Sequence, residues 1–179
     1  MQTIESQTKQ VQAAQAGDID SFGKLCEAYY SPLVAVAYSV LGDHQLAEDA
    51  VQEAFARGLT NLRKLKDVDK FAPWLAQICR NVAIDMARAR RRTATLEGVE
   101  PSTEPDSNRS VVVVVRAAID RLPASMREVV ILRYYNNCSY EQVSAVLGLS
   151  KASINGRLTR AKRRLTKYLR RQGVLEDMP

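Results

Sequence analysis

The sequence predicts an all-α protein made of two small helical domains joined by a flexible linker. Three observations lead to this expectation. Apolar residues recur at intervals of three and four along both halves of the chain, which is the spacing of a buried helix face. No stretch of useful length alternates apolar and polar residues as a half-buried strand does. An acidic stretch that contains two prolines separates the two halves.

Charge divides the 179-residue chain at the same places. Residues 1–92 carry a net charge of +1, residues 93–110 carry −3 and residues 111–179 carry +8. The middle stretch has no aromatic residue and little periodicity, which is typical of a flexible linker. We therefore expect one domain over 1–92, an acidic linker over 93–110 and a second domain over 111–179. The basic excess favours a polyanionic partner.

Composition excludes several classes of protein. The longest apolar runs, 33–38 and 111–115, are far shorter than the ~20 residues of a membrane helix, and the first ten residues form no secretory signal. We expect no membrane insertion and a cytoplasmic location. Three widely spaced cysteines and one histidine form neither a disulfide framework nor a multi-histidine metal site, and no glycine-rich phosphate loop occurs. We expect no metal, no cofactor and no enzymatic activity.

The N-terminal half predicts three main helices and a short one before Gly17. The first runs from Phe22 to Leu41, begins at a cap on Asp20 or Ser21, and ends at Gly42. The second covers about 45–62. The third covers about 70–92, with Asp69 as its expected cap. Trp74 belongs to the apolar stripe of this helix, so core packing is favoured over stacking on a base.

The C-terminal half begins with a predicted helix that ends before Pro123, although five consecutive valines disfavour helix by propensity. A second helix is expected over 125–135. The next residues have helix-turn-helix spacing. Ser139 and Gln142 form a capping box, Gly148 supplies the turn, and Ser150 caps the second helix.

The helix after Ser150 is strongly basic. Residues 151–171 contain nine Lys or Arg and no acid. A solvated basic face is one interpretation. The helix-turn-helix spacing favours DNA, because the major groove admits a helix and phosphates attract Lys and Arg. Polar residues that could meet DNA lie in its first half: Lys151, Ser153, Asn155, Arg157, Thr159 and Arg160.

These segments resemble the extracytoplasmic-function group of bacterial sigma factors. Three segments resemble sigma region two: AGDIDSFGKLCEAYY (16–30), LGDHQLAEDAVQEAF (41–55) and FAPWLAQICRNVAID (71–85). Region four resembles LPASMREVVILRYY (122–135) together with the helix-turn-helix. The resemblance covers nearly the whole chain. It implies that the chain joins core RNA polymerase, recognises and helps to melt promoter DNA, and is masked by an anti-sigma factor.

The resemblance also implies roles for single residues. The residues that it implies for binding of core polymerase are Asp49, Gln52 and Glu53. The unwound minus-ten strand would be held by Lys66, Asp69, Lys70, Arg80, Asn81 and Arg88. The helix-turn-helix would read the upstream, minus-thirty-five element.

Two alternatives stay open at this point. One is a helix-turn-helix DNA-binding regulator that acts without polymerase docking, in which the acidic helix would have no use. The other is an enzyme that acts on nucleic acid, which would need a carboxylate cluster or a metal set. The acids here lie on outer helix faces or in the linker.

Overall fold

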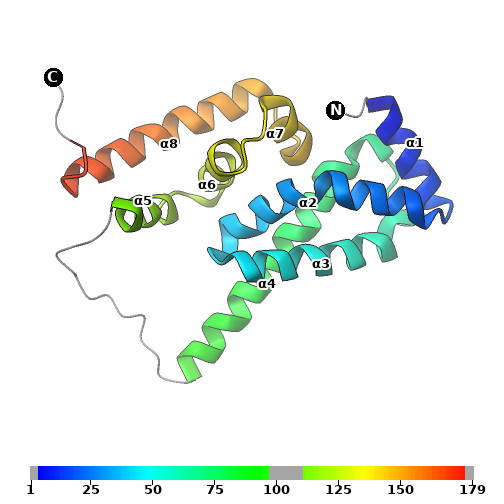
Figure 1. Ribbon diagram of the computed structural model, residues 1–179, viewed down its shortest axis with the longest axis horizontal. Helices are drawn as coiled ribbons and strands as arrows, with labels where there is room; N and C mark the ends of the chain where they lie inside the picture. Colours follow the sequence, from blue (N-terminus) through cyan, green and yellow to red (C-terminus); the bar gives the residue numbers. More distant parts are fainter. Residues whose placement is uncertain (1–3, 97–110, 176–179) are drawn as a thin grey trace.

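The computed structural model describes residues 4–96 and 111–175, and every regular element within them is a helix or a helical turn. Figure 1 shows the helices arranged as two domains, which confirms the expected fold class. The first domain contains α1 (Ile4–Gln15), α2 (Ile19–Leu41), α3 (His44–Asn61), the 3-10 turns η1 (Leu62–Lys64) and η2 (Val68–Lys70), and α4 (Phe71–Leu96). The second contains α5 (Val111–Asp120), α6 (Ala124–Val130), the π-helical turn η3 (Ile131–Tyr135), α7 (Tyr140–Leu147) and α8 (Lys151–Arg171).

Helix α4 is longer than the sequence predicts. It continues to Leu96, four residues into the stretch expected to be linker, and its last turns project beyond α2 and α3 in Figure 1. The rest of the predicted flexible linker, from residue 97 to 110, lies outside the described residues.

The caps of the first domain follow local rules. Asp18, and not Asp20 or Ser21, caps α2: its carboxylate accepts from the backbone N–H of Asp20 and from the hydroxyl of Ser21. The predicted end at Gly42 is confirmed, since this residue is left-handed with a φ of 66°. Asp43 then caps α3 by accepting from the N–H of Leu46. A two-residue connection, Gly42 and Asp43, therefore fixes how α3 leaves α2.

The core of the first domain lies where α2, α3 and α4 cross. Phe71 and Leu75 of α4 are fully buried against it, and Trp74 is half-buried with its ring 6.0 Å from that of Phe71. Trp74 therefore lies in the apolar packing, as its place in the stripe predicts. Gly58 of α3 sets the approach of the two helices, because a Cβ there would lie only 2.9 Å from Cδ1 of Leu75.

The valine run of the second domain is helical despite its propensity. Only Val114 of these five residues is buried, while Val111, Val112 and Val113 are exposed. The predicted helix over 125–135 divides into α6 and the wider η3, in which the N–H of Asn136 bonds to the carbonyl of Ile131.

The helix-turn-helix has the predicted form. The hydroxyl of Ser139 accepts from the N–H of Gln142, whose side chain accepts in return from the N–H of Ser139. Gly148 is left-handed at the turn, and Ser150 caps α8. The hydroxyl of Ser144 donates to the carbonyl of Leu149 and fastens the turn to α7. These bonds fix the angle at which α8 begins.

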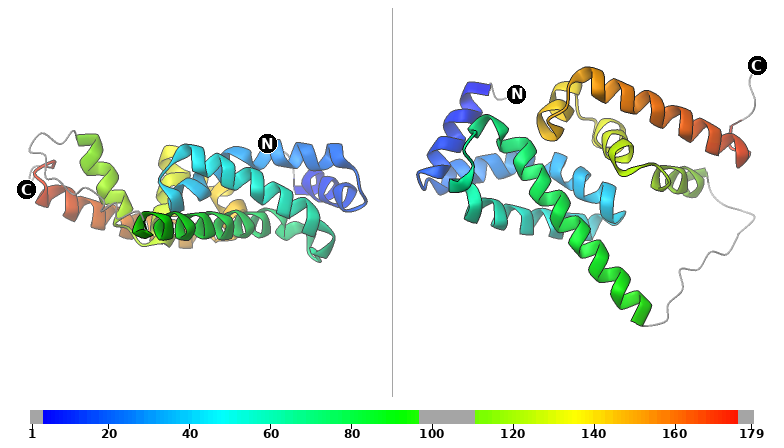
Figure 2. Two further views of the ribbon diagram at one scale, coloured as in Figure 1. Left: turned by 90° about the horizontal axis from the view of Figure 1, so that it is seen from below. Right: turned by 180° about the vertical axis from the view of Figure 1, so that it is seen from behind.

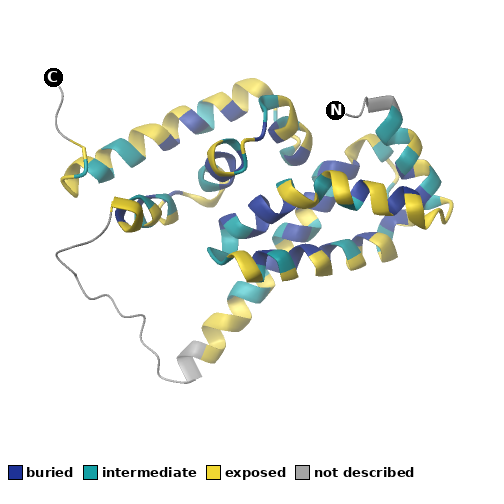
Figure 3. Cartoon of the chain, viewed as in Figure 1, coloured by how far each residue is buried: buried dark blue, intermediate teal, exposed yellow. Residues whose placement is uncertain are grey.

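The two domains are in direct contact. Their buried side chains form one apolar cluster, and Figure 3 shows the buried faces of α2, α4, α6 and α7 turned inward. The Tyr38 and Tyr135 rings stack 5.3 Å apart, and the hydroxyl of Ser31 donates to Asn136 over 2.9 Å. Helices α6 and α7 lie between α8 and the first domain (Figures 1 and 2). The basic helix is therefore the outermost element of its domain.

The close approach at Gly58 gives a prediction about stability. Gly58→Val should lower the free energy of unfolding by about 1–3 kcal/mol, because the added methyl groups overpack a fully buried contact with Leu75. Denaturant unfolding followed by circular dichroism measures this change. Gly23→Val is the control, because an added Cβ at this exposed position in α2 meets nothing within 4 Å. Equal stabilities of the two variants would contradict the prediction.

Candidate nucleic-acid and protein interfaces

The outer face of α3 is polar and exposed. Asp49, Gln52 and Glu53 all lie on it, opposite the fully buried Ala50 and Val51. Glu53 pairs with Arg57 at 2.7 Å, whereas Asp49 and Gln52 make no side-chain hydrogen bond or ion pair among the described residues. The structure thus brings the three residues predicted to bind polymerase together on one accessible face.

The turn before α4 carries three of the residues predicted to hold the minus-ten strand. Lys66, Asp69 and Lys70 are all exposed there. The hydroxyl of Thr8 donates to the Asp69 carboxylate over 2.8 Å, which ties this turn to α1. The predicted cap at Asp69 is replaced by Asp67. Its carboxylate accepts from the N–H of Asp69 and caps η2, the 3-10 turn that leads into α4.

Further along α4, the predicted residues differ in their surroundings. Asn81 is exposed and its Oδ1 accepts from the amide of Gln77 over 2.8 Å. Gln77 in turn accepts from Nη1 of Arg80 over 2.6 Å. Arg88 is exposed and lies 4.0 Å from Asp85. A chain of side-chain contacts therefore links Asn81 to Arg80.

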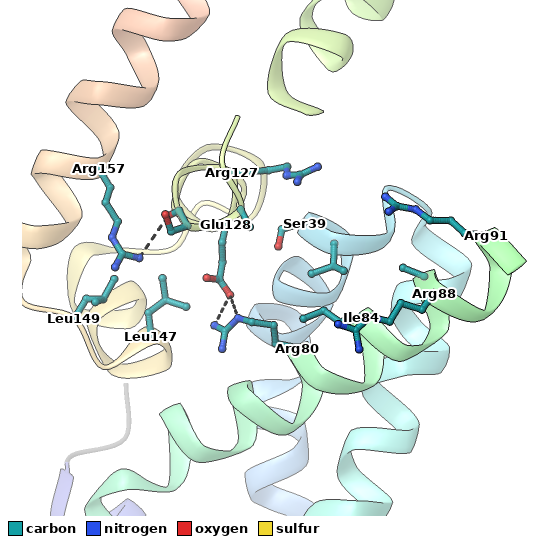
Figure 4. Close-up of a pocket in the computed structure, with 14 residues that line it drawn as sticks. Ser39, Arg80, Ile84, Arg88, Arg91, Arg127, Glu128, Leu147, Leu149 and Arg157 are labelled. Atoms are coloured by element: carbon teal, nitrogen blue, oxygen red, sulfur yellow. Dashed lines mark hydrogen bonds and ion pairs between the residues drawn. The ribbon is translucent and has the colours of Figure 1, made fainter. Parts of the chain in front are cut away.

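Arg80 faces the second domain. Its Nε and Nη2 both donate to Oε1 of Glu128, over 3.1 and 2.5 Å (Figure 4). The side chain of Arg80 is 25% exposed and that of Glu128 only 9%. Sequence reasoning did not identify Glu128 as a partner, because it lies 48 residues away in the other domain. The one signal in the sequence was the position of Glu128, an acidic residue inside an apolar helical stripe, where a partner for its charge would be needed.

A cleft of about 550 Å³ lies beside this ion pair, between the domains. Its apolar lining includes Val40, Ile84, Leu147 and Leu149. Its charged lining is five arginines and one carboxylate, namely Arg80, Arg88, Arg91, Arg127, Arg157 and Glu128. The wall of this cleft is therefore strongly cationic, as the labelled side chains in Figure 4 show.

Five of the six predicted reader residues lie on the exposed side of α8: Lys151, Ser153, Asn155, Thr159 and Arg160. Arg157 does not, since it is half-buried, lines the interdomain cleft and donates to the carbonyl of Ser125 over 3.4 Å. The periodicity that places Ile154 and Leu158 inward did not distinguish these two sides.

Local contacts orient two of these cations. Lys151 pairs with Glu141 at 2.5 Å, and this ammonium lowers the pKa of the Glu141 carboxyl to about 2. Nε of Arg160 donates to the carbonyl of Gly156 over 3.0 Å. An added Cβ at Gly156 would lie 3.9 Å from Nη2 of Arg160, which is an ordinary van der Waals contact. The position of this guanidinium along α8 therefore does not depend on the glycine.

The later turns of α8 form a shallow cationic hollow. It is lined by Lys162, Arg163, Lys167, Arg170 and Arg171, with threonines between them. Concentrated positive charge on an exposed helix attracts phosphates without reading bases.

The thiols are poor nucleophiles. Burial raises the pKa of Cys26 to about 11 and that of Cys79 to about 12, and it also raises the pKa of Cys138. Within the described ranges, no three metal-ligating side chains lie together and no helix is long and apolar enough to cross a membrane.

Comparison with known proteins gives two family matches. Residues 25–93 match the model for Sigma-70 region 2, and residues 113–165 match that for Sigma-70, region 4. Together these matches take in most of α2, all of α3, most of α4 and most of the second domain. The two matches define the class of protein: it combines a sigma region 2 bundle with a region 4 helix-turn-helix.

Individual relatives agree with these matches. The chain is 34% identical over 161 residues to the probable RNA polymerase sigma factor RfaY of Xanthomonas campestris, covering 83% of this chain but only 40% of that protein. It is 32% identical to the ECF RNA polymerase sigma factor EcfG of Rhodopseudomonas palustris, over 82% of this chain and 84% of that protein. The chain therefore belongs to the sigma-70 family, within its extracytoplasmic-function (ECF) group.

A solved structure shares the fold. The sigma factor RpoE from Bartonella quintana, crystallised with the anti-sigma factor NepR, aligns with a TM-score of 0.56 at 27% sequence identity. The alignment covers 83% of this chain and 96% of that one.

Proposed function

We propose that this chain binds core RNA polymerase and directs promoter-specific initiation, with region 2 melting the minus-ten element and region 4 reading the minus-thirty-five element. The observation that carries the proposal is the presence in one chain of an accessible acidic helix face on α3 and an outermost basic helix on α8. We assign residues 1–92 to region 2, 93–110 to the linker, whose first four residues continue helix α4, and 111–179 to region 4.

The outer face of α3 is the proposed polymerase contact. The side chains of Asp49, Gln52 and Glu53 are exposed and contribute little to the core, so they are available to a partner. Charged groups on a rim steer a partner of opposite charge and fix its orientation. The partner surface is therefore expected to be basic where it meets this face.

Melting is assigned to the turn before α4 and to the following face of that helix. Lys66 and Lys70 supply charge for the strand, and the exposed amide of Asn81 can pair with the edge of an extruded base. A captured base repays part of the cost of unstacking. Arg80 and Arg88 extend this surface along α4.

Upstream recognition is assigned to the first turns of α8. The five exposed residues from Lys151 to Arg160 lie on the side that a groove would meet. The later cations, around Lys167, supply attraction that does not depend on sequence. An anti-sigma factor is the proposed inhibitor, which agrees with the RpoE–NepR complex of a related protein.

Run-off transcription with purified core polymerase tests the whole proposal. Addition of the chain should produce transcripts from its own promoter. In the cell, we propose that the chain acts in the cytoplasm and is not itself an enzyme. A helix-turn-helix regulator that does not dock on polymerase, or an enzyme acting on nucleic acid, would leave core polymerase without a promoter-specific product.

The polymerase contact can be tested by charge reversal. The double variant Asp49→Lys and Glu53→Lys should weaken binding to core polymerase at least ~10-fold, because it replaces attraction by repulsion at a charged interface. Helix content and melting temperature should stay the same, since both residues are exposed. Binding is measured by pull-down of core, with Glu27→Lys on the exposed side of α2 as the control. Unchanged pull-down by the double variant would rule out this contact.

The melting role predicts a selective defect for Asn81→Ala. Open-complex formation should fall about 10-fold, while closed-complex binding is retained, because the amide is proposed to hold an unpaired base. Permanganate footprinting measures melting on duplex and on pre-melted promoter DNA. Gln77→Ala, which removes only the neighbouring amide that donates to Asn81, should cause a smaller defect. Equal defects of Asn81→Ala on both templates would instead indicate a general loss of folding.

The reader helix predicts different behaviour for two cations of α8. Arg160→Ala should cost ~1–3 kcal/mol at one base position and relax the preference there, as expected for a base contact. Lys167→Ala should weaken binding to all sequences and lower the salt slope by ~1, as expected for a phosphate contact. Transcription from a randomised upstream element separates the two. If both variants lose activity equally on every sequence, Arg160 reads no base.

A further inference from the structure

The ion pair between Arg80 and Glu128 joins one domain to the other. Both donor atoms of Arg80 converge on a single oxygen of Glu128, and Glu128 is one of the few buried polar residues among those described. Paired donation by a guanidinium is among the stronger kinds of hydrogen bond. This contact lies at the wall of the cationic cleft in Figure 4.

Further side-chain contacts surround the pair and cross the same boundary. Tyr38 stacks on Tyr135 with an interplanar angle of 5°. Pro73 contacts the glycine turn of the helix-turn-helix, where a Cβ on Gly148 would lie 3.3 Å from Cβ of Pro73. None of these contacts is part of a helix ladder. The domains also share one apolar cluster, so their separation exposes part of this cluster to water.

We propose that this closed arrangement is an autoinhibited state in which Glu128 occupies Arg80 in place of promoter DNA. The proposal rests on the proposed function, because it takes Arg80 to be part of the minus-ten surface. The Glu128 carboxylate offers Arg80 the same anionic oxygen that a phosphate would offer. Arg80 also holds Gln77, whose amide donates to Asn81, so the pair reaches a second residue of the same surface.

The spacing of promoter elements supports this interpretation. Elements centred about ten and about thirty-five base pairs upstream lie roughly 80 Å apart on straight B-form DNA. Two small domains, each about 30 Å across and in direct contact, are too close together to reach both elements at once. The contacts made by Arg80, Tyr38 and Pro73 must therefore break before both domains bind the promoter.

The ion pair stabilises the closed form relative to the open form. While the domains stay together, removal of one charge leaves the other half-buried and uncompensated, which is unfavourable. Once the domains separate, both groups return to water. Loss of the Glu128 charge should therefore shift the chain toward the open form, with Arg80 free for DNA.

Small-angle X-ray scattering of the free, full-length protein tests the closed state. The wild type should be compact, and Glu128→Gln should increase the radius of gyration as the closed-to-open ratio falls about 10-fold, the scale expected for a charged hydrogen bond. Glu141→Gln is the control, because Glu141 pairs with Lys151 inside the second domain and neither residue lines the cleft. A Glu128→Gln profile that coincides with the wild type, or a wild type that is already extended, would overturn the proposal.

Tyr135→Ala provides an independent variant that does not alter a buried charge. Tyr135 is 62% exposed, so the domain should remain folded while the stack on Tyr38 is lost. The same expansion is expected. No expansion, with helix content retained, would show that the stack does not hold the domains and would count against the closed state.

Inhibition is tested by the rate of transcription when free protein is added to core polymerase and promoter. Glu128→Gln should initiate about 10-fold faster than wild type, in line with its shifted ratio. Both proteins should be equally active once assembled with polymerase. Expansion without faster initiation would overturn the inhibitory role. If the wild type directs no transcription even when assembled, the proposed function fails, while the scattering result still decides whether the closed state exists.

Discussion

The buried stripe of helix α4 is the constraint on which both domains depend. Phe71, Leu75 and Cys79 are fully buried against α2 and α3, so the rotation of α4 about its axis is fixed. The fixed rotation also determines the directions in which residues on the other faces of the same helix point. Asn81 is directed to solvent and Arg80 to the second domain. Pro73 at its start supports the turn of the helix-turn-helix. One packed helix thus sets the core, a candidate DNA surface and the position of the second domain.

Much of the fold was predictable because its signals are local. Helix faces repeat every three to four residues, and a cap is formed within four residues of the helix it begins. The capping box at Ser139 and the glycine turns at Gly42 and Gly148 were therefore predicted correctly. The cap of α2 was placed two or three residues late, because several neighbouring polar residues could cap it and only their geometry selects Asp18. The exposed valines of α5 could not be judged from propensity, since tertiary packing overrides it.

The candidate sites were predictable only where a helix face alone decides exposure. Asp49, Gln52 and Glu53 follow from the period of α3, and the structure places them on one accessible face. Arg80 and Arg157 were expected to be available to DNA, yet both line the boundary between the domains. Their partners come from other elements, 48 residues away for Arg80 and 32 for Arg157. No sequence period carries information about contacts between separate elements of the fold.

The single tryptophan has a consequence that follows from its position. Trp74 lies in the core beside Phe71, next to the Pro73 that contacts the helix-turn-helix. Its indole is half-buried, with its ring 6.0 Å from that of Phe71, so its contact with water depends on the packing of the first domain. The wavelength of indole emission depends on that contact. The protein therefore carries a native fluorophore in the packing of its first domain, and its intrinsic emission can follow unfolding of that domain in real time without an added label.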